Sequence, residues 1–194
     1  MNKLIFATHN DHKFGEVKKL IGDLYDLVDL DDIGITDDIP ETGDTLESNA
    51  RIKARYVKEH CGNSVFADDT GLEVEILNGQ PGVYTARFAG PECDSEKNME
   101  KLLRVMEGEE NRRAQFRTVI CLIIGDNEYL FEGVVKGRIA TKTSGTGGFG
   151  YDPVFIPDGY DKTFAEMPSE LKNQISHRAI AVERFATFLK ELGN

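Results

Sequence analysis

The order of apolar and polar positions in the first part of the chain predicts strands that alternate with helices. A short apolar run over residues 3–7 is typical of a buried strand, and residues 25–30 alternate as a second strand would. Between these runs, apolar residues recur three and four positions apart, which is the spacing of one helix face. The predicted face consists of Val17, Leu20, Ile21 and Leu24.

A second amphipathic helix is predicted after an acidic segment. Asp44 is of a residue type that caps helices, and Glu47 at the third helical position would complete a capping box. A third apolar run over residues 64–67 follows and leads directly into Asp68-Asp69-Thr70-Gly71. The apolar face of the helix would carry Leu46, Ala50, Ala54 and Val57, with Lys53 beside it.

The second half of the chain contains a strong hairpin signal. Gly125-Asp126-Asn127 separates two strand-like runs over residues 114–124 and 129–139. Residues 153–156 also resemble a strand. Two further helices are predicted, one capped by Asp94 and one that begins after Ser176. They would bury Met99, Leu102, Leu103 and Met106 in the first case and Ala181, Phe185, Phe188 and Leu192 in the second.

Strands and helices therefore intermix along the whole chain, and at least one hairpin is present. This order favours an α/β fold with a mixed sheet over a purely parallel one. The 194 residues show no internal repeat, long linker or low-complexity segment, which fits one domain over residues 1–194.

Composition excludes several classes of protein. The net charge of −11 disfavours a DNA or RNA binder, because phosphate contacts need a basic face. A phosphorylated small molecule would require a divalent cation and a few well-placed Lys or Arg residues. No apolar run reaches the length of a membrane span, and residues 1–7 lack the apolar core of a signal peptide. We expect a cytoplasmic protein with Cys61, Cys93 and Cys121 as free thiols.

The adjacent carboxylates Asp68 and Asp69 suggest a metal site. Each would disfavour the ionised form of the other unless a cation sat between them. Magnesium would remove that cost, since it accepts one or two carboxylates together with substrate phosphates. The alternative is a surface turn, because Asp-Asp-Thr-Gly is common turn chemistry.

The loop before the first predicted helix could bind an anion. Thr8, Asn10 and Lys13 supply donors beside a helix N-terminus. The loop lacks the glycine-rich run of a Walker motif, and an ordinary helix cap explains it equally well. Further along, Glu41-Thr42-Gly43 precedes the helix that carries Lys53, whereas the acids from Asp29 to Asp44 do not fit a calcium loop and have no evident function.

Aromatic and basic residues gather late in the sequence. Gly145, Gly147 and Gly150 form a literal G-x-G-x-x-G, but a strand rather than a helix is predicted after it, which argues against a dinucleotide site. Phe149 and Tyr151 could cover a purine face or simply be core aromatics beside a tight turn. His177-Arg178 would lie in the first turn of a helix, where positive charge is unfavourable, and this suggests a functional role.

Seven blocks of sequence follow one another along the chain. They are Thr8-His9-Asn10-Asp11-His12-Lys13, Glu41-Thr42-Gly43, Asn49-Ala50-Arg51-Ile52-Lys53-Ala54, Ala67-Asp68-Asp69-Thr70-Gly71-Leu72, Pro81-Gly82-Val83-Tyr84-Thr85-Ala86-Arg87, Gly147-Gly148-Phe149-Gly150-Tyr151-Asp152-Pro153 and Ser176-His177-Arg178. Together they closely resemble the inosine triphosphate pyrophosphatase family, also called the non-canonical purine NTP or dITP/XTP pyrophosphatases. The resemblance extends essentially from end to end.

This resemblance implies a fold and a reaction. The fold would be α/β, with a long mixed central sheet flanked by helices and two lobes around an active-site cleft, assembled as a homodimer. The enzyme would hydrolyse ITP, dITP and XTP to the nucleoside monophosphate and pyrophosphate, with Mg²⁺ as cofactor. Its purpose would be to keep deaminated purines out of the nucleotide pool.

The resemblance also implies a role for each matched residue. A magnesium-bound water would attack with Asp69 as general base, and the metal would be held by Glu41, Asp68 and Asp69. Thr70 would contact the phosphates or the sugar. The triphosphate would lie against Thr8, His9, Asn10, Asp11, His12, Lys13 and Lys53. The base would lie against Phe149, Gly150, Tyr151, Asp152, Lys172, His177 and Arg178.

Two other functions remain open at this stage. One is a pyrophosphatase for a different base, such as a modified pyrimidine. The other is a nucleotide-binding sensor without catalysis, against which the Asp68-Asp69 pair argues, since a sensor needs no general base.

Overall fold

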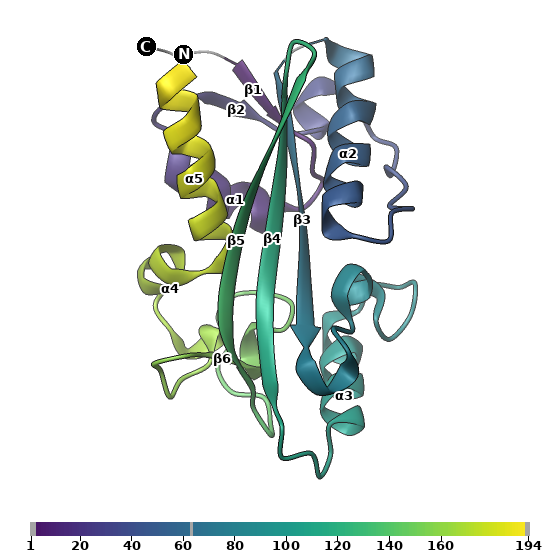
Figure 1. Cartoon of the computed structure of the whole chain (residues 1–194), viewed down its shortest axis with the longest axis vertical. Coiled ribbons are helices and arrows are strands. Elements are labelled where there is room, and N and C mark those ends of the chain that lie inside the picture. Colours follow the sequence, from purple (N-terminus) through teal and green to yellow (C-terminus); the bar gives the residue numbers. More distant parts are fainter. Residues whose placement is uncertain (1–2, 63, 193–194) are drawn as a thin grey trace. The chain divides into compact units, whose positions relative to one another are not determined.

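A computed structural model describes residues 3–62 and 64–192 (Figure 1). The chain divides into two compact units, each built from segments that are separate in sequence. Unit 1 contains Met1–Asp69, Thr118–Gly133 and Arg178–Asn194, and unit 2 contains Thr70–Arg117 and Val134–His177.

The strands form one six-stranded sheet in the order β2-β1-β3-β4-β5-β6. β1 pairs in parallel with β2 and β3, whereas β5 and β6 are antiparallel. A two-residue turn, Gly125-Asp126, joins β4 to β5, as the hairpin signal predicts. The mixed sheet is therefore confirmed. The strands are β1 Lys3–Phe6, β2 Asp26–Val28, β3 Val65–Val74, β4 Arg113–Ile124, β5 Asn127–Ile139 and β6 Phe155–Pro157.

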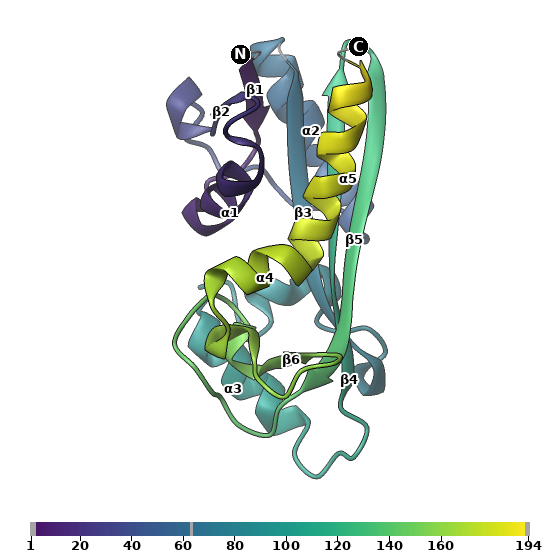
Figure 2. The same cartoon turned by 90° about the vertical axis from the view of Figure 1, so that its left-hand side faces the viewer.

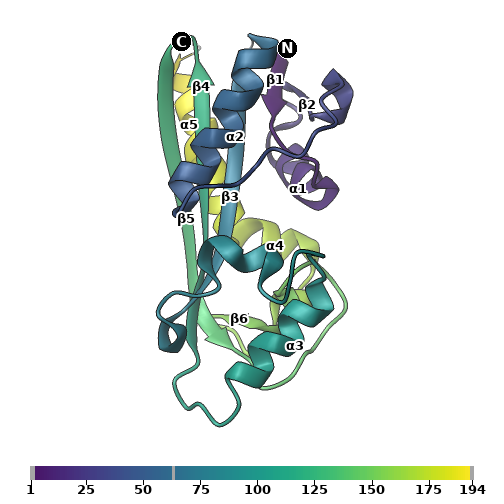
Figure 3. The ribbon, with the colours of Figure 1, turned by 90° about the vertical axis from the view of Figure 1, so that its right-hand side faces the viewer.

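Unit 1 packs helices on both faces of its strands. α5 (His177–Leu192) runs alongside β5, and α2 (Leu46–Cys61) runs alongside β3 (Figures 2 and 3). α1 (Asp11–Ile21) shares the apolar core of α5. At the centre of that core the rings of Phe6 and Phe66 stack at 4.4 Å, and Phe185 lies 4.9 Å from Phe66.

Unit 2 has a separate core. Phe116 of β4 lies 4.7 Å from Phe155 of β6, and Phe164 lies 5.3 Å from Phe155. α3 (Ser95–Val105) contributes Leu102, and Met106 follows it. The short helix α4 (Ser169–Ile175) had no counterpart in the sequence prediction, because seven residues offer too few turns for a clear apolar period. The 3₁₀ helices lie at Asp31–Ile33, Glu75–Leu77, Gly82–Arg87, Asp152–Val154 and Phe164–Glu166.

Two predicted helix faces require correction. α1 ends at Ile21, so Leu24 lies beyond the helix and is exposed, and Leu20 is also exposed. In α5, Leu192 was predicted to be buried but is exposed, because the helix turns this last apolar position away from the core. Leu189 is buried instead. By contrast, the four predicted apolar residues of α2 are all buried.

The predicted cap of α2 is displaced by one residue. Thr45, not Asp44, is the N-cap, and its hydroxyl accepts a hydrogen bond from Ser48 N at 3.1 Å. Ser48 Oγ in turn accepts from Thr45 N at 3.1 Å, so the box closes with Ser48 in place of Glu47. Asp94 caps α3 as predicted.

The cysteines are free, as expected. Cys121 is buried in β4, and burial raises the pKa of its thiol to about 11. Within residues 3–62 and 64–192, no helix combines the length and the apolar character that a membrane span requires.

The capping geometry predicts a difference between two neighbouring variants. Thr45→Ala should lower the free energy of unfolding by about 1 kcal/mol, because it exposes the first turn of α2 without a side-chain acceptor. Asp44→Ala is the control and should change it by less than about 0.5 kcal/mol. Urea titrations followed by circular dichroism measure both. Equal losses in the two variants would contradict the assignment of the cap.

Candidate active site

The two adjacent carboxylates lie inside a strand rather than in a turn. β3 continues from Val65 through Val74, and Asp68 and Asp69 are both buried within it. Successive side chains of a strand point to opposite faces of the sheet. Asp68 therefore shares the face of Phe66, on the side of α1 and α5, whereas Asp69 points toward α2. The surface-turn alternative is wrong.

This alternation also corrects the electrostatic argument made from the sequence. A single cation between Asp68 and Asp69 is not needed, because each carboxylate has its own cationic partners on its own face. Lys13 serves the first and Lys53 the second.

The Asp68 face carries a closed network of charges. Lys13 Nζ donates to Asp68 Oδ1 at 3.0 Å, and Arg178 Nε donates to Asp68 Oδ2 at 3.4 Å. Arg178 also donates to Glu16 on α1 and is only 2% exposed. Burial would raise the pKa of Asp68, but Lys13, Arg178 and Lys53 outweigh it and hold that pKa well below its usual range. Asp68 is therefore ionised, whereas burial lowers the pKa of Lys13.

The Asp69 face is less well compensated. Lys53 Nζ donates to Glu41 Oε1 at 2.6 Å and lies 3.6 Å from Asp69 Oδ1. Burial raises the pKa of Asp69, and Lys53 and Lys13 offset this only in part, while Glu41 adds to it. Asp69 is consequently the more basic carboxylate of the two, as a general base requires.

The loop from Thr8 to Lys13 acts as a helix cap and also presents a cation. Asn10 caps α1 by accepting from Lys13 N at 3.0 Å, and Thr8 Oγ1 accepts from Asn10 N at 3.1 Å. His9 binds the acidic segment, with Nδ1 3.2 Å from Asp31 Oδ1. The remaining predicted contacts in this region are Asp11 and His12, which are exposed, and Thr70, which is half-buried beside Asp69.

Glu41 and Asp69 are the carboxylates that fit a magnesium ion. Both point at Lys53 Nζ, so their oxygens converge on one positively charged position. Two carboxylates completed by substrate phosphates form a normal Mg²⁺ donor set. Among the described residues, no group of three or more acidic, His or Cys side chains is placed to hold a metal, and Asp68 is committed to Lys13 and Arg178.

Unit 2 brings three of the predicted base-side residues, Phe149, Asp152 and Lys172, together at a buried ion pair, whereas Arg178 belongs to unit 1 and pairs there with Asp68. Lys172 Nζ donates to Asp152 Oδ2 at 2.7 Å, and both side chains are less than 10% exposed. The same carboxylate oxygen accepts from Phe149 N at 2.8 Å, and Lys172 Nζ lies 5.0 Å from the centre of the Phe149 ring. Gly148 has φ +71°, and a Cβ there would lie 2.0 Å from Asp152 Oδ2, so the turn requires glycine.

The two aromatic residues of this loop have different environments. Tyr151 is buried in the core of unit 2, where its hydroxyl donates to Thr85 O at 2.8 Å and burial raises its pKa. The core-aromatic alternative is therefore right for Tyr151. Phe149 is half-buried. The next residue, Gly150, adopts φ +61°. Elsewhere in unit 2, the ring of His177 stacks on that of Phe116 with 4.6 Å between the ring centres.

A model of the Ham1 family matches residues 4–188, which is nearly the whole chain. The chain belongs to the Ham1 family. A dITP/XTP pyrophosphatase of Porphyromonas gingivalis is 51% identical over 190 residues, which cover 97% of this chain and 98% of that protein. A dITP/XTP pyrophosphatase of Christiangramia forsetii is 50% identical over 97% of this chain and its own full length. The solved Ham1 protein of Staphylococcus aureus is 39% identical with a TM-score of 0.90, covering 98% and 99% of the two chains.

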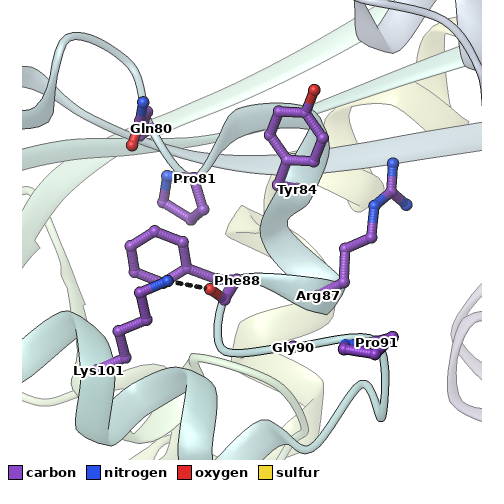
Figure 4. Close-up of a pocket in the computed structure, with 8 residues that line it drawn as sticks. All are labelled: Gln80, Pro81, Tyr84, Arg87, Phe88, Gly90, Pro91 and Lys101. Atoms are coloured by element: carbon purple, nitrogen blue, oxygen red, sulfur yellow. Dashed lines mark hydrogen bonds between the residues drawn. The ribbon is translucent and has the colours of Figure 1, made fainter.

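The block from Pro81 to Arg87 forms a feature of this Ham1 chain that the sequence left without a role. It lines a pocket of about 480 Å³ in unit 2 (Figure 4). There Arg87 Cζ lies 5.2 Å from the centre of the exposed Tyr84 ring, and Lys101 Nζ donates to Phe88 O. None of the predicted site residues lines this pocket. Thr85 instead connects the block to β3, because its hydroxyl accepts from Leu72 N at 2.8 Å.

Sequence reasoning missed two residues that contact the site, the half-buried Glu16 and the buried Asn49. Glu16 lies one helical turn after Lys13, and its spacing of three residues is a signal that both face the same way. Asn49 lies one turn before Lys53 and makes contact with Gly43. Neither residue type is diagnostic in a helix sequence, so only the packing reveals them.

The ion pair of unit 2 predicts an asymmetric response to mutation. Asp152→Ala should lower the free energy of unfolding by about 3 kcal/mol or more, because it leaves the Lys172 ammonium buried without its carboxylate. Asp152→Ala combined with Lys172→Met should restore part of that loss. Guanidinium titrations of the two single variants and the double variant measure the coupling. Strict additivity would show that the two side chains do not stabilise each other.

Proposed function

We propose that this Ham1 chain hydrolyses the non-canonical purine triphosphates ITP, dITP and XTP to the nucleoside monophosphate and pyrophosphate. The observation that carries the proposal is the pair of buried carboxylates on β3. Asp68 is neutralised by Lys13 and Arg178, whereas Asp69 is raised in pKa and stands beside Glu41 and Lys53. The names of the relatives, which match along the whole chain, agree with this reaction.

Asp69 is the proposed general base. It would accept a proton from the attacking water, while the ammonium groups of Lys13 and Lys53 would neutralise charge on the triphosphate. Thr8 and Asn10 would add donors at the start of α1, as would the backbone there. His9, Asp11, His12 and Thr70 remain predicted contacts of the triphosphate or sugar.

Mg²⁺ is the proposed cofactor. When bound, it would polarise the phosphate oxygens and offset their charge. Glu41 and Asp69 would hold it, since their oxygens already converge on one cation. Asp68, the third predicted ligand, lies on the opposite face of the strand. It would contribute to the site indirectly, through its hydrogen bond with Lys13.

The base-side residues would read the purine. Phe149 is half-buried and its ring would stack on the purine, while the Asp152–Lys172 pair holds the loop in place. A donor aimed at the purine 6-oxygen would be left unpaired by ATP, which carries an amino group there. Lys172, His177 and Arg178 are the proposed donors, with Gly150 and Tyr151 shaping the loop. We further propose that the protein acts in the cytoplasm as a homodimer.

The first prediction of this proposal concerns substrate choice. With Mg²⁺ present, pyrophosphate release from ITP, dITP and XTP should exceed release from ATP by at least about 100-fold in kcat/KM, because the unpaired donor disfavours the amino group. A coupled pyrophosphate assay at equal concentrations, with GTP and pyrimidine triphosphates in the panel, measures it. Release of single phosphate, or preference for a pyrimidine, would overturn the proposal. Tight binding without turnover would identify a sensor.

A second prediction concerns the general base. Asp69→Asn should fold normally and lose at least about 10³-fold in kcat, since it removes both the base and a metal ligand. Asp161→Asn is the control, because Asp161 is fully exposed. Near-normal turnover in Asp69→Asn would assign the proton transfer to another group.

A further inference from the structure

Asn49 lies at a junction between the Glu41 loop and the Asp69 strand. It is the fourth residue of α2 and is fully buried. Its Oδ1 accepts a hydrogen bond from Gly43 N at 2.8 Å. A buried polar side chain with a loop backbone as its partner fixes the position of that loop relative to the helix.

The loop that carries Glu41 and Gly43 packs tightly against the start of α2. A Cβ built on Gly43 would lie 2.7 Å from Asn49 Oδ1 and 2.1 Å from Ser48 Oγ, so only glycine fits there. The cap of the same helix, formed by Thr45 and Ser48, follows two residues later. Glu41, two residues before Gly43, is therefore placed by the contact between this backbone and Asn49.

The Nδ2 end of the Asn49 amide lies on the side of Asp69, the proposed general base. Asn49 lies one helical turn before Lys53, on the same side of α2, and Lys53 Nζ lies between Glu41 and Asp69. Asn49 Nδ2 is buried and has no hydrogen-bond acceptor of regular geometry among the described residues. The Asn49 amide nevertheless interacts with the Asp69 carboxylate. A buried donor without a regular partner is costly unless it serves the site.

We propose that Asn49 is a positioning residue that sets the separation between Glu41 and Asp69. Its Oδ1 holds the Gly43 backbone, and its Nδ2 is directed at the Asp69 carboxylate. The inference rests on the proposed function, because it assigns Asn49 to the reaction of that site. Displacement of reacting groups by about 1 Å can reduce turnover by about 10²-fold.

Loss of Asn49 should therefore lower turnover without lowering nucleotide affinity. Loss of Asn49 moves Glu41 relative to Asp69 but leaves Lys13, on the opposite face of β3, with its own partner Asp68. Nucleotide affinity should therefore persist when turnover falls. A residue that merely stabilised the fold would lower both in proportion to the amount of folded protein.

The test compares three variants in the full-length protein. Asn49→Ala removes both hydrogen-bonding groups, and Asn49→Asp keeps an acceptor for Gly43 N while replacing the donor that faces Asp69. The matched control is Asn98→Ala. Asn98 is also buried, is the fourth residue of α3, accepts from Ala89 N and donates to Ala86 O.

For both Asn49 variants we expect kcat with ITP and Mg²⁺ to fall by about 50-fold or more, with KM within about threefold of wild type. Calorimetry with a non-hydrolysable α,β-methylene analogue of ITP should give an affinity within about threefold of wild type. Asn98→Ala should lower the melting temperature by at least as much as Asn49→Ala and leave kcat within about threefold.

Two results would overturn the inference. One is a kcat within threefold of wild type in either Asn49 variant. The other is a loss of kcat and analogue affinity that follows the loss of melting temperature, as in Asn98→Ala. If Asn49→Ala does not fold, Asn49→Asp decides the question, since it retains the bond to Gly43. Failure of the wild type to hydrolyse ITP would instead refute the proposed function.

Discussion

The alternation of side chains along β3 is the constraint on which the candidate site depends. Adjacent residues of a strand face opposite sides of the sheet, so Asp68 and Asp69 enter different environments although they are neighbours in sequence. One side offers α1 and α5 with Lys13 and Arg178, and the other offers α2 with Lys53. A turn at this point would have placed both carboxylates in water, where neither pKa would shift far from its ordinary value.

Because the cations on the two faces compensate the buried carboxylates unequally, Asp68 and Asp69 differ in pKa. Lys13, Arg178 and Lys53 hold Asp68 ionised despite burial, whereas Asp69 shares Lys53 with Glu41 and has a raised pKa. Pairs of titratable groups that their surroundings push apart in pKa are characteristic of catalytic sites. Burial of this many charges stabilises a fold poorly, because the desolvation cost offsets much of the attraction. Preorganised charge is useful to a reaction that needs electrostatic stabilisation, and hydrolysis of a phosphoanhydride bond is such a reaction.

The acidic segment before α2 also acquires a structural explanation. Asp29 and Asp32 exchange hydrogen bonds through their side chains and backbone amides, and Asp31 accepts from His9. Three of the acids that the sequence left without a function therefore make local hydrogen bonds, within this segment and to the loop before α1.

Local patterns in the sequence were sufficient for the hairpin, the buried face of α2 and the mixed sheet, because each depends on a period or a turn within a few residues. The ordered blocks were sufficient for membership of the Ham1 family. Tertiary structure alone decided that Thr45 rather than Asp44 caps α2. It alone brought Arg178 into contact with Asp68, 110 positions away in the sequence, and with Glu16, 162 positions away. It alone brought Asn49 to Gly43 and directed Asp68 and Asp69 to opposite faces. Such contacts depend on which elements pack together, and no periodicity along the chain encodes the partner of a buried charge.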